Sequence, residues 1–143
     1  MRYSTKLSDG IHILAYIYLF PDKPLSSTAI SESLQTNPVV VRRLMAKLKK
    51  AKILNTTVGI PKPILSRTPE EISLYEIYQA VEEGQRFFHV NSHTNTDCPA
   101  GSVIQEALTK QYDVFQTVML EELSQHTLSE VIKDMKAIGD FSE

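Results

Sequence analysis

Residues 37–52 read NPVVVRRLMAKLKKAK, and this stretch decides the fold predicted for the whole chain. Asn37 is a preferred N-cap residue, and Pro38 suits the first helical position, where its missing N–H would have had no intrahelical partner. Beyond it, apolar residues recur with the i, i+3, i+4, i+7 spacing of a helix that buries one face. The predicted buried stripe consists of Val41, Leu44, Met45 and Leu48.

The opposite face of this predicted helix is basic. The stretch contains six Lys and Arg residues and no acid, so these charges have no partner within the helix. We therefore expect this face to lie against something negatively charged. At about 100° per residue, the face carries Val39, Arg43, Ala46 and Lys50, flanked by Arg42, Lys47 and Lys49.

Two further helices are predicted before this stretch. Apolar spacing indicates a first helix over residues 5–20, in which Gly10 permits a close crossing with another element. Ser26 can cap a short helix over 27–34, and residues 35–36 form a turn. A short helix, a tight turn and a longer basic helix make a helix-turn-helix, whose second helix enters the major groove of DNA.

A β-hairpin, or wing, is predicted after the basic helix. Residues 53–58 are β-branched and Thr-rich, 59–63 form a Pro/Gly turn containing Lys62, and 64–66 are extended again. The two prolines of the turn argue against tight pairing at the tip, because proline cannot donate a ladder hydrogen bond.

The second half of the chain is predicted to be helical. Capping boxes begin at Thr68, Ser73 and Thr127, and the longest helical pattern runs over residues 99–124. A helix of that length spans about 35 Å, more than a small winged domain needs to cover its core, so we expect it to pack partly against a second copy. The predicted dimerisation residues are Ile104, Leu108, Phe115, Met119 and Leu123.

Charge divides the chain into two regions. Residues 1–67 hold 11 Lys/Arg and three acids, a net charge of +8, whereas 68–143 hold four Lys/Arg and 14 acids, a net charge of −10. Such asymmetry is typical of a region that binds a polyanion, followed by a region that has a different function. We predict a mainly α fold with a small β-hairpin: a winged helix-turn-helix DNA-binding region over 1–67 and a helical dimerisation and sensing region over 68–143.

Composition narrows the class of protein. No apolar run approaches the roughly 20 residues of a membrane span, and Asp9, Gly10 and His12 interrupt any signal-peptide pattern. We therefore expect a cytoplasmic protein that does not contact membranes. A single cysteine excludes an internal disulfide. We expect no enzymatic activity, because the chain lacks a Gly-rich phosphate loop, a nucleophile elbow and a His-Glu-x-x-His motif.

The order of these elements resembles a known family, the BadM/Rrf-type bacterial winged-helix transcription regulators. The resemblance covers nearly the whole chain and is most specific in NPVVVRRL at 37–44, LKKA at 48–51, PEEISL at 69–74 and AVE at 80–82. It implies a homodimer that crosses two long C-terminal helices and reads a pseudo-palindromic operator in double-stranded DNA with two winged heads.

The chain departs from this family in two places. Members that hold a 2Fe–2S cluster carry three cysteines before and at the start of the long helix, whereas this chain has only Cys98. Because iron–sulfur clusters are held mostly by thiolates, we expect no cluster and no other cofactor. The wing lacks the family's glycine pair, and Pro61 and Lys62 occupy that place.

The predicted DNA contacts fall into two sets. Arginine on guanine is the commonest specific contact, and a valine methyl can pack on thymine. Base edges are therefore the predicted partners of Asn37, Val39, Val40 and Arg43. Phosphates are the predicted partners of Ser26, Ser27 and Thr28 at a helix N-terminus, and of Arg42, Lys47, Lys50 and Lys62. The alternative is that these residues are solvated charges and caps.

Cys98 is the predicted regulatory residue. Followed by Pro99, it can sit at the N-cap or first turn of the long helix, where the dipole lowers a thiol's pKa, while Asp97 acts in the opposite direction. An oxidant or small electrophile would then modify Cys98 and shift the two long helices. The alternative is a semi-buried structural cysteine. A metal site formed by Cys98 with His89, His93 and Asp97 would have plausible ligand types, but these residues show no recurring motif spacing, so we expect no metal site.

Together these features predict a sequence-specific DNA-binding transcription regulator, a homodimeric repressor switched at Cys98. Two alternatives stay open. One is a regulator controlled by a partner rather than by its cysteine. The other is a winged-helix interaction module whose basic face meets an acidic protein.

Overall fold

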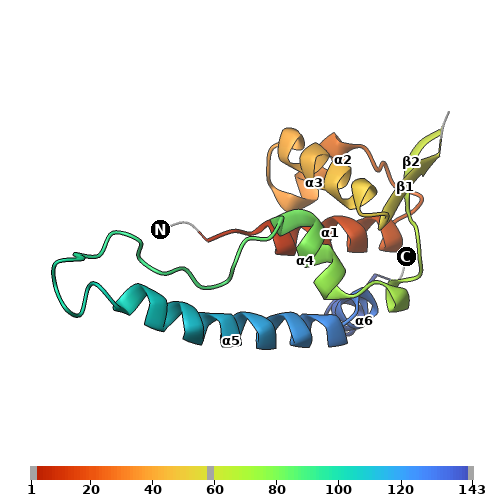
Figure 1. Ribbon diagram of the computed structural model, residues 1–143. Coiled ribbons are helices and arrows are strands. Elements are labelled where there is room, and N and C mark those ends of the chain that lie inside the picture. Colours follow the sequence, from red (N-terminus) through yellow and green to blue (C-terminus); the bar gives the residue numbers. More distant parts are fainter. Residues whose placement is uncertain (1–2, 58–59, 142–143) are drawn as a thin grey trace.

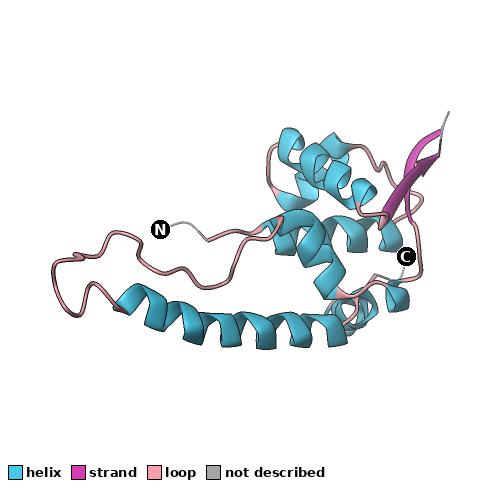
Figure 2. Cartoon of the chain, in the orientation of Figure 1, coloured by secondary structure: helices cyan, strands magenta, loops and turns pink. Residues whose placement is uncertain are grey.

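Figure 1 shows the computed structural model of the protein, which describes residues 3–57 and 60–141. The described chain is mostly helical, with one antiparallel hairpin (Figure 2), which confirms the predicted fold class. The elements are, in order, α1 (Lys6–Leu19), α2 (Ser27–Leu34), α3 (Pro38–Lys50), β1 (Leu54–Thr57), β2 (Ile60–Leu65), the 3₁₀ turn η1 (Pro69–Glu71), α4 (Leu74–Glu82), α5 (Ile104–Gln125) and α6 (Leu128–Ile138).

All elements except α5 pack into one unit, which we call the head, while α5 runs out along its lower side (Figure 1). The predicted stripe of α3 is confirmed as buried. The predicted boundary at residue 67, between a DNA-binding and a dimerisation region, stays a prediction. One hydrophobic core contains residues from both sides of it. Core side chains that are at most 3% exposed include Ile13, Leu14, Ile30, Leu48, Ile53, Ile72, Ile77, Val81, Leu128 and Ile132.

The crossing of α1 and α4 depends on Gly10. A Cβ added there would lie 3.1 Å from Val81 Cγ1 and 3.4 Å from Ile77 Cγ2. A larger side chain would push the two helices apart, so the close crossing predicted from Gly10 is confirmed. Through this contact, α4 becomes part of the core that supports the helix-turn-helix.

The hairpin is longer and better paired than predicted. Thr56 pairs with Pro63 and Thr57 with Ile60, with a register irregularity between the two threonines. In a two-stranded ribbon both strands are edges, so a proline can face away from the ladder. Lys62 therefore lies on β2 rather than in a turn. The predicted tip includes residues 58–59, which lie outside the described part of the chain.

The long helix begins later than predicted. Its first residue is Ile104, with Val103 at the N-cap, whereas the pattern suggested a start near Pro99. Residues 83–103, which we call the arm, run along α5 as loop and turn (Figure 2). Phe87 N donates to Gln116 Oε1 at 3.0 Å, which ties the arm to the middle of α5. At the far end, a Cβ on Gly101 would collide with the Asn95 carbonyl, so the tight turn there requires glycine.

The junction between α5 and the head is centred on His126. Its carbonyl accepts a hydrogen bond from Leu74 N at 2.9 Å. Its ring lies between two carboxylates, with Nε2 2.8 Å from Glu122 and Nδ1 2.8 Å from Glu130. A neutral imidazole has only one N–H donor, so both contacts are hydrogen bonds only when the ring is protonated. Glu122 and Glu130 accordingly raise the pKa of His126 above its ordinary value of 6.5.

This raised pKa predicts a pH-dependent stability. Because the folded pKa lies above the unfolded one, the stabilisation is fully present below about pH 6 and is lost as pH rises through the folded pKa. We expect His126→Gln to lower the midpoint of urea unfolding at about pH 5.5 and to leave it nearly unchanged at about pH 8.5. An NMR titration of the His126 ring that gives a pKa at or below 6.5 would contradict this prediction.

Candidate nucleic-acid interface

The exposed face of α3 carries the basic residues that periodicity placed there. Asn37 Oδ1 accepts a hydrogen bond from Val39 N at 2.9 Å, which fixes the start of the helix and confirms the predicted cap. The amide oxygen of Asn37 is therefore used in the cap, and its NH₂ group remains as the side-chain hydrogen-bond donor. Val39 is 45% exposed although it is apolar. Val40 is half-buried, and the other exposed positions of this face are Arg42, Arg43, Ala46, Lys49 and Lys50.

Most of these cations have no counter-charge among the residues that the structure describes. Among residues 3–57 and 60–141, no ion pair involves Arg42, Arg43 or Lys50. Lys47 differs, because its Nζ lies 3.5 Å from a carboxylate oxygen of Glu83, just beyond α4. Sequence reasoning missed this pair, since no local pattern joins the two residues. A phosphate contact of Lys47 would compete with Glu83, whereas Arg43 and Lys50 are free to meet one.

The N-terminus of α2 lies on the surface of the same motif. Ser26 Oγ accepts a hydrogen bond from Ala29 N at 3.1 Å, so Ser26 is the N-cap, as predicted. Ser26 and Thr28 are exposed and Ser27 is half-buried. The Ser26 hydroxyl proton is still available as a donor. On the wing, Lys62 is exposed on β2. Contact of these groups with phosphate stays a prediction.

One side of α5 is apolar and exposed. None of the residues of α5 is buried. Of the predicted dimerisation residues, Leu108 and Leu123 are half-buried and the other three are exposed. Sequence reasoning missed Val114 and Val118, which extend the same side at an i, i+4 spacing. The exposed stripe, 40–58% exposed at each residue, consists of Ile104, Val114, Phe115, Val118 and Met119.

Aromatic contacts join the arm to this stripe. The Phe88 ring lies 5.5 Å from Tyr112 and 5.7 Å from Phe115, centroid to centroid. Phe87 stacks on Tyr78 of α4 at 4.8 Å. Through these rings the arm connects the exposed stripe of α5 to the head.

Cys98 lies in the arm, and its thiol is exposed. The prediction that it sits at the N-cap or first turn of the long helix is wrong, because Val103 is the N-cap and Cys98 lies in the turns that precede α5, where its carbonyl accepts a hydrogen bond from Ser102 N at 2.9 Å. The sequence predicted two opposing effects on the pKa of this thiol, from the helix dipole and from Asp97. The backbone N–H groups of Gly101 and Ala100 lower the pKa of the Cys98 thiol. Local turn geometry, rather than the dipole of α5, is the cause.

The other candidate ligands in the arm do not assemble with this cysteine. His89, His93 and Asp97 are all exposed. In the part of the chain that the structure describes, no three His, Cys, Asp or Glu side chains lie close enough to hold one metal ion. Within these same residues, every helix is too short or too polar to cross a lipid bilayer.

Known proteins share the sequence pattern and the fold of this chain. The sequence model of the Rrf2 family, described as iron-dependent transcriptional regulators, matches residues 3–134. YwnA of Bacillus subtilis (strain 168), an inferred HTH-type transcriptional regulator, is 39% identical over 132 residues, which are 92% of this chain and 98% of YwnA. A crystal structure of an inferred DNA-binding protein is 37% identical with a TM-score of 0.69, and covers 89% of this chain and 98% of its own.

More distant structures share the fold. IscR of T. potens is 21% identical with a TM-score of 0.66, over 94% of this chain and 88% of its own. The iron in the family description does not fit the residues of this chain. It has one cysteine, and its described residues contain no group of three metal-ligating side chains.

Proposed function

Since the chain belongs to the Rrf2 family of DNA-binding transcription regulators and is not an enzyme, we propose that it is a cytoplasmic repressor that binds a pseudo-palindromic operator as a homodimer. The observation that carries this proposal is the exposed face of α3, where Arg42, Arg43 and Lys50 have no ion pair among the described residues. DNA phosphates would supply the missing counter-charges, and base edges would be read by the residues between them.

The proposed dimer is supported by the exposed stripe of α5. Isolated apolar side chains are normal on a protein surface, whereas a contiguous apolar stripe marks an interaction site. Val114, Phe115, Val118 and Met119 fall on adjacent turns of one helix side. Two copies packed through this stripe would hold two α3 helices at one fixed spacing. A two-fold dimer requires a two-fold related site, which is why we propose a pseudo-palindromic operator.

The test is selection of bound duplexes from random or genomic DNA, followed by titration of the best site against random duplex at several salt concentrations. We expect a large preference for the selected site and a steep fall of affinity with salt. A protein that makes about six phosphate contacts loses roughly 10³-fold in affinity between 50 and 200 mM salt. Weak binding that ignores sequence would instead favour the interaction module, in which the basic face meets an acidic protein.

We further propose that Cys98 switches the regulator. Its thiol is exposed and its pKa is lowered by the Gly101 and Ala100 N–H groups, so more of it is the reactive thiolate. A quinone is a suitable electrophile: the thiolate sulfur forms a bond to a ring carbon as the ring C=C π bond breaks. One quinone oxygen takes up a proton from solvent, and the proton on the attacked carbon moves to the other oxygen, which gives the hydroquinone thioether. The adduct would sit on the arm, which contacts the start of α5 through Thr94 and Gln105.

The Cys98→Ser variant tests this switch. We expect benzoquinone to release the wild-type protein from its operator and to leave the variant bound, because serine does not add to a quinone at neutral pH. Fluorescence anisotropy of labelled operator gives the bound fraction, and mass spectrometry gives the adduct. If the variant is released as readily as the wild type, control by a partner or by another ligand becomes the better explanation.

The proposed regulator uses no cofactor. Its single cysteine supplies too few thiolates for an iron–sulfur cluster within one chain. Protein purified without oxygen is therefore expected to contain no stoichiometric iron or sulfide and to bind the operator in that state. Stoichiometric iron in such a preparation would overturn this part of the proposal.

A further inference from the structure

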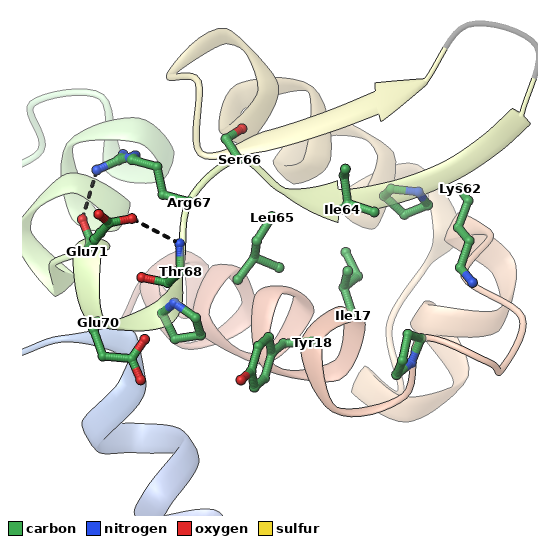
Figure 3. Close-up of a pocket in the computed structure, with 13 residues that line it drawn as sticks. Ile17, Tyr18, Lys62, Ile64, Leu65, Ser66, Arg67, Thr68, Glu70 and Glu71 are labelled. Carbon is green, nitrogen blue, oxygen red and sulfur yellow. Dashed lines mark hydrogen bonds between the residues drawn. The ribbon is translucent and has the colours of Figure 1, made fainter.

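A groove lies on the head between the end of α1, strand β2 and η1 (Figure 3). Its volume is about 610 Å³, within the range of about 300–1,000 Å³ that is typical of small-molecule sites. No residue of α3 lines the groove. The groove adjoins the wing on one side and the turn that leads into α4 on the other.

The walls of the groove are apolar and incompletely covered. Ile17 of α1 faces Ile64 of β2 across the groove (Figure 3). Ile17 is only 3% exposed and belongs to the core, whereas Tyr18 is 45% and Ile64 50% exposed. Removing such apolar surface from water is favourable. The remaining apolar lining comes from Pro21, which is exposed, from Leu65, which is half-buried, and from Pro63 and Pro69, which are buried.

The charges around the groove differ between its two ends. Lys62, at the wing end (Figure 3), forms no ion pair among the described residues. At the η1 end each charged side chain has a partner within the protein. Arg67 lies 2.9 Å from Glu76, Glu70 accepts from Ser129 Oγ at 3.2 Å, and Glu71 accepts from Thr68 N at 3.2 Å.

We propose that this groove binds a small, flat aromatic carboxylate, with its ring against Tyr18 and Ile64 and its carboxylate on the Lys62 ammonium group. The exposed face of the Tyr18 ring favours an aromatic ring over a branched aliphatic group. Of the two lining cations, Arg67 is paired with Glu76, whereas Lys62 has no acidic partner among the described residues, so Lys62 selects an acid.

The opposite end of the groove fixes the orientation of the ligand. Hydrogen bonds from the backbone N–H of Glu70 and from the Ser129 hydroxyl lower the pKa of the Glu70 carboxyl, so this group stays charged at neutral pH. Glu70 and Glu71 would repel a second carboxylate there. The acid therefore points to the wing, and the apolar body points to η1.

Binding at this site has a consequence for DNA, which rests on the proposed function. Lys62 is also a proposed phosphate contact of the wing, so a bound carboxylate competes with phosphate for the same ammonium group. By linkage, ligand and DNA then weaken each other's binding by the same factor. The groove would act as an effector site that is independent of Cys98.

The direct test is an NMR titration of the full chain with 2-naphthoate, without DNA, at about pH 7. We expect saturable shifts of the Tyr18, Ile64 and Leu65 amides. Neutral 2-naphthamide, which has the same ring, should bind more weakly, and cationic 2-naphthylmethylamine more weakly still. Absence of saturable shifts at these residues, or binding of the amide or the amine as tight as that of the acid, overturns the proposal.

Two exposed lysines provide matched variants. Lys62→Gln is expected to weaken 2-naphthoate about fivefold, the upper range for an exposed ion pair, and to leave 2-naphthamide unchanged. Lys6→Gln, at the other end of α1, should change neither. If Lys62→Gln lowers the affinity for both ligands equally, the cause is the shape of the groove rather than its charge. That result would overturn the role of the ammonium group.

The link to DNA is tested separately by anisotropy with the selected operator. Saturating 2-naphthoate should weaken operator binding by the wild type and have no effect on Lys62→Gln. Operator binding by the wild type that naphthoate leaves unchanged overturns the competition. If naphthoate shifts the groove residues but the protein binds no duplex, the groove stands and the proposed function fails. If the operator is bound but naphthoate is not, the function stands and the groove fails.

Discussion

Arg43→Ala is expected to abolish most of the preference for the operator over random duplex. Arg43 is exposed on α3 and forms no ion pair among the described residues, so its guanidinium is free to meet a guanine. One well-placed contact of this kind contributes about 1–3 kcal/mol of discrimination, and a homodimer uses it twice. We therefore expect operator affinity to fall about 100-fold or more, while affinity for random duplex falls only slightly.

Lys50→Ala is the matched control for this experiment. Lys50 lies on the same face of α3 and is also exposed, but its proposed partner is a phosphate. Its loss should weaken specific and random DNA alike and reduce the salt slope by about one per site. If Arg43→Ala shows this uniform behaviour instead, Arg43 contacts phosphate and base reading rests on other residues of α3. Unchanged thermal unfolding of both variants shows that the fold is intact.

Val118→Asp is expected to convert the dimer to a folded monomer. Val118 is 57% exposed in the single chain, so the substitution should leave the thermal stability of the head nearly unchanged. In the proposed dimer, two buried aspartates without counter-charges would face each other, which costs several kcal/mol. Sedimentation velocity should therefore report a monomer at micromolar concentration, and operator affinity should fall because the two heads are no longer linked.

Thr117→Asp controls for the added charge. Thr117 is exposed on α5 outside the exposed stripe, and its hydroxyl donates to the Asp113 carbonyl. This variant should remain a dimer and bind the operator normally. If Val118→Asp remains a dimer, the dimer interface does not lie on the exposed stripe. A monomeric wild type would remove the proposed homodimer altogether.

Much of the local structure follows from short-range chemistry in the sequence. Asn37 and Ser26 cap α3 and α2 as predicted, and Ser73 accepts a hydrogen bond from Glu76 N at 3.1 Å to start α4. Each of these contacts joins residues two or three positions apart. The periodicity of α3 likewise separates its buried stripe from its basic face. The greater part of the candidate DNA-binding surface could therefore be predicted before any tertiary contact is known.

Contacts between distant residues are what the sequence could not supply. Lys47 looked as free as Arg43 on a helical wheel, but α4 brings Glu83 to within 3.5 Å of it. Cys98 was predicted at a helix start because Pro99 follows it, yet the turn around Gly101 packs on Asn95 and delays the helix to Ile104.

The sequence by itself determined the helix-turn-helix, the basic face of α3 and the division of charge, because caps, periodicity and charge are properties of neighbouring residues. Only the tertiary structure decided which side of α5 is exposed, how β2 pairs despite Pro63, and where Lys62 stands beside Tyr18 in the groove. These features depend on residues that lie far apart along the chain and meet only when the core of the head has formed.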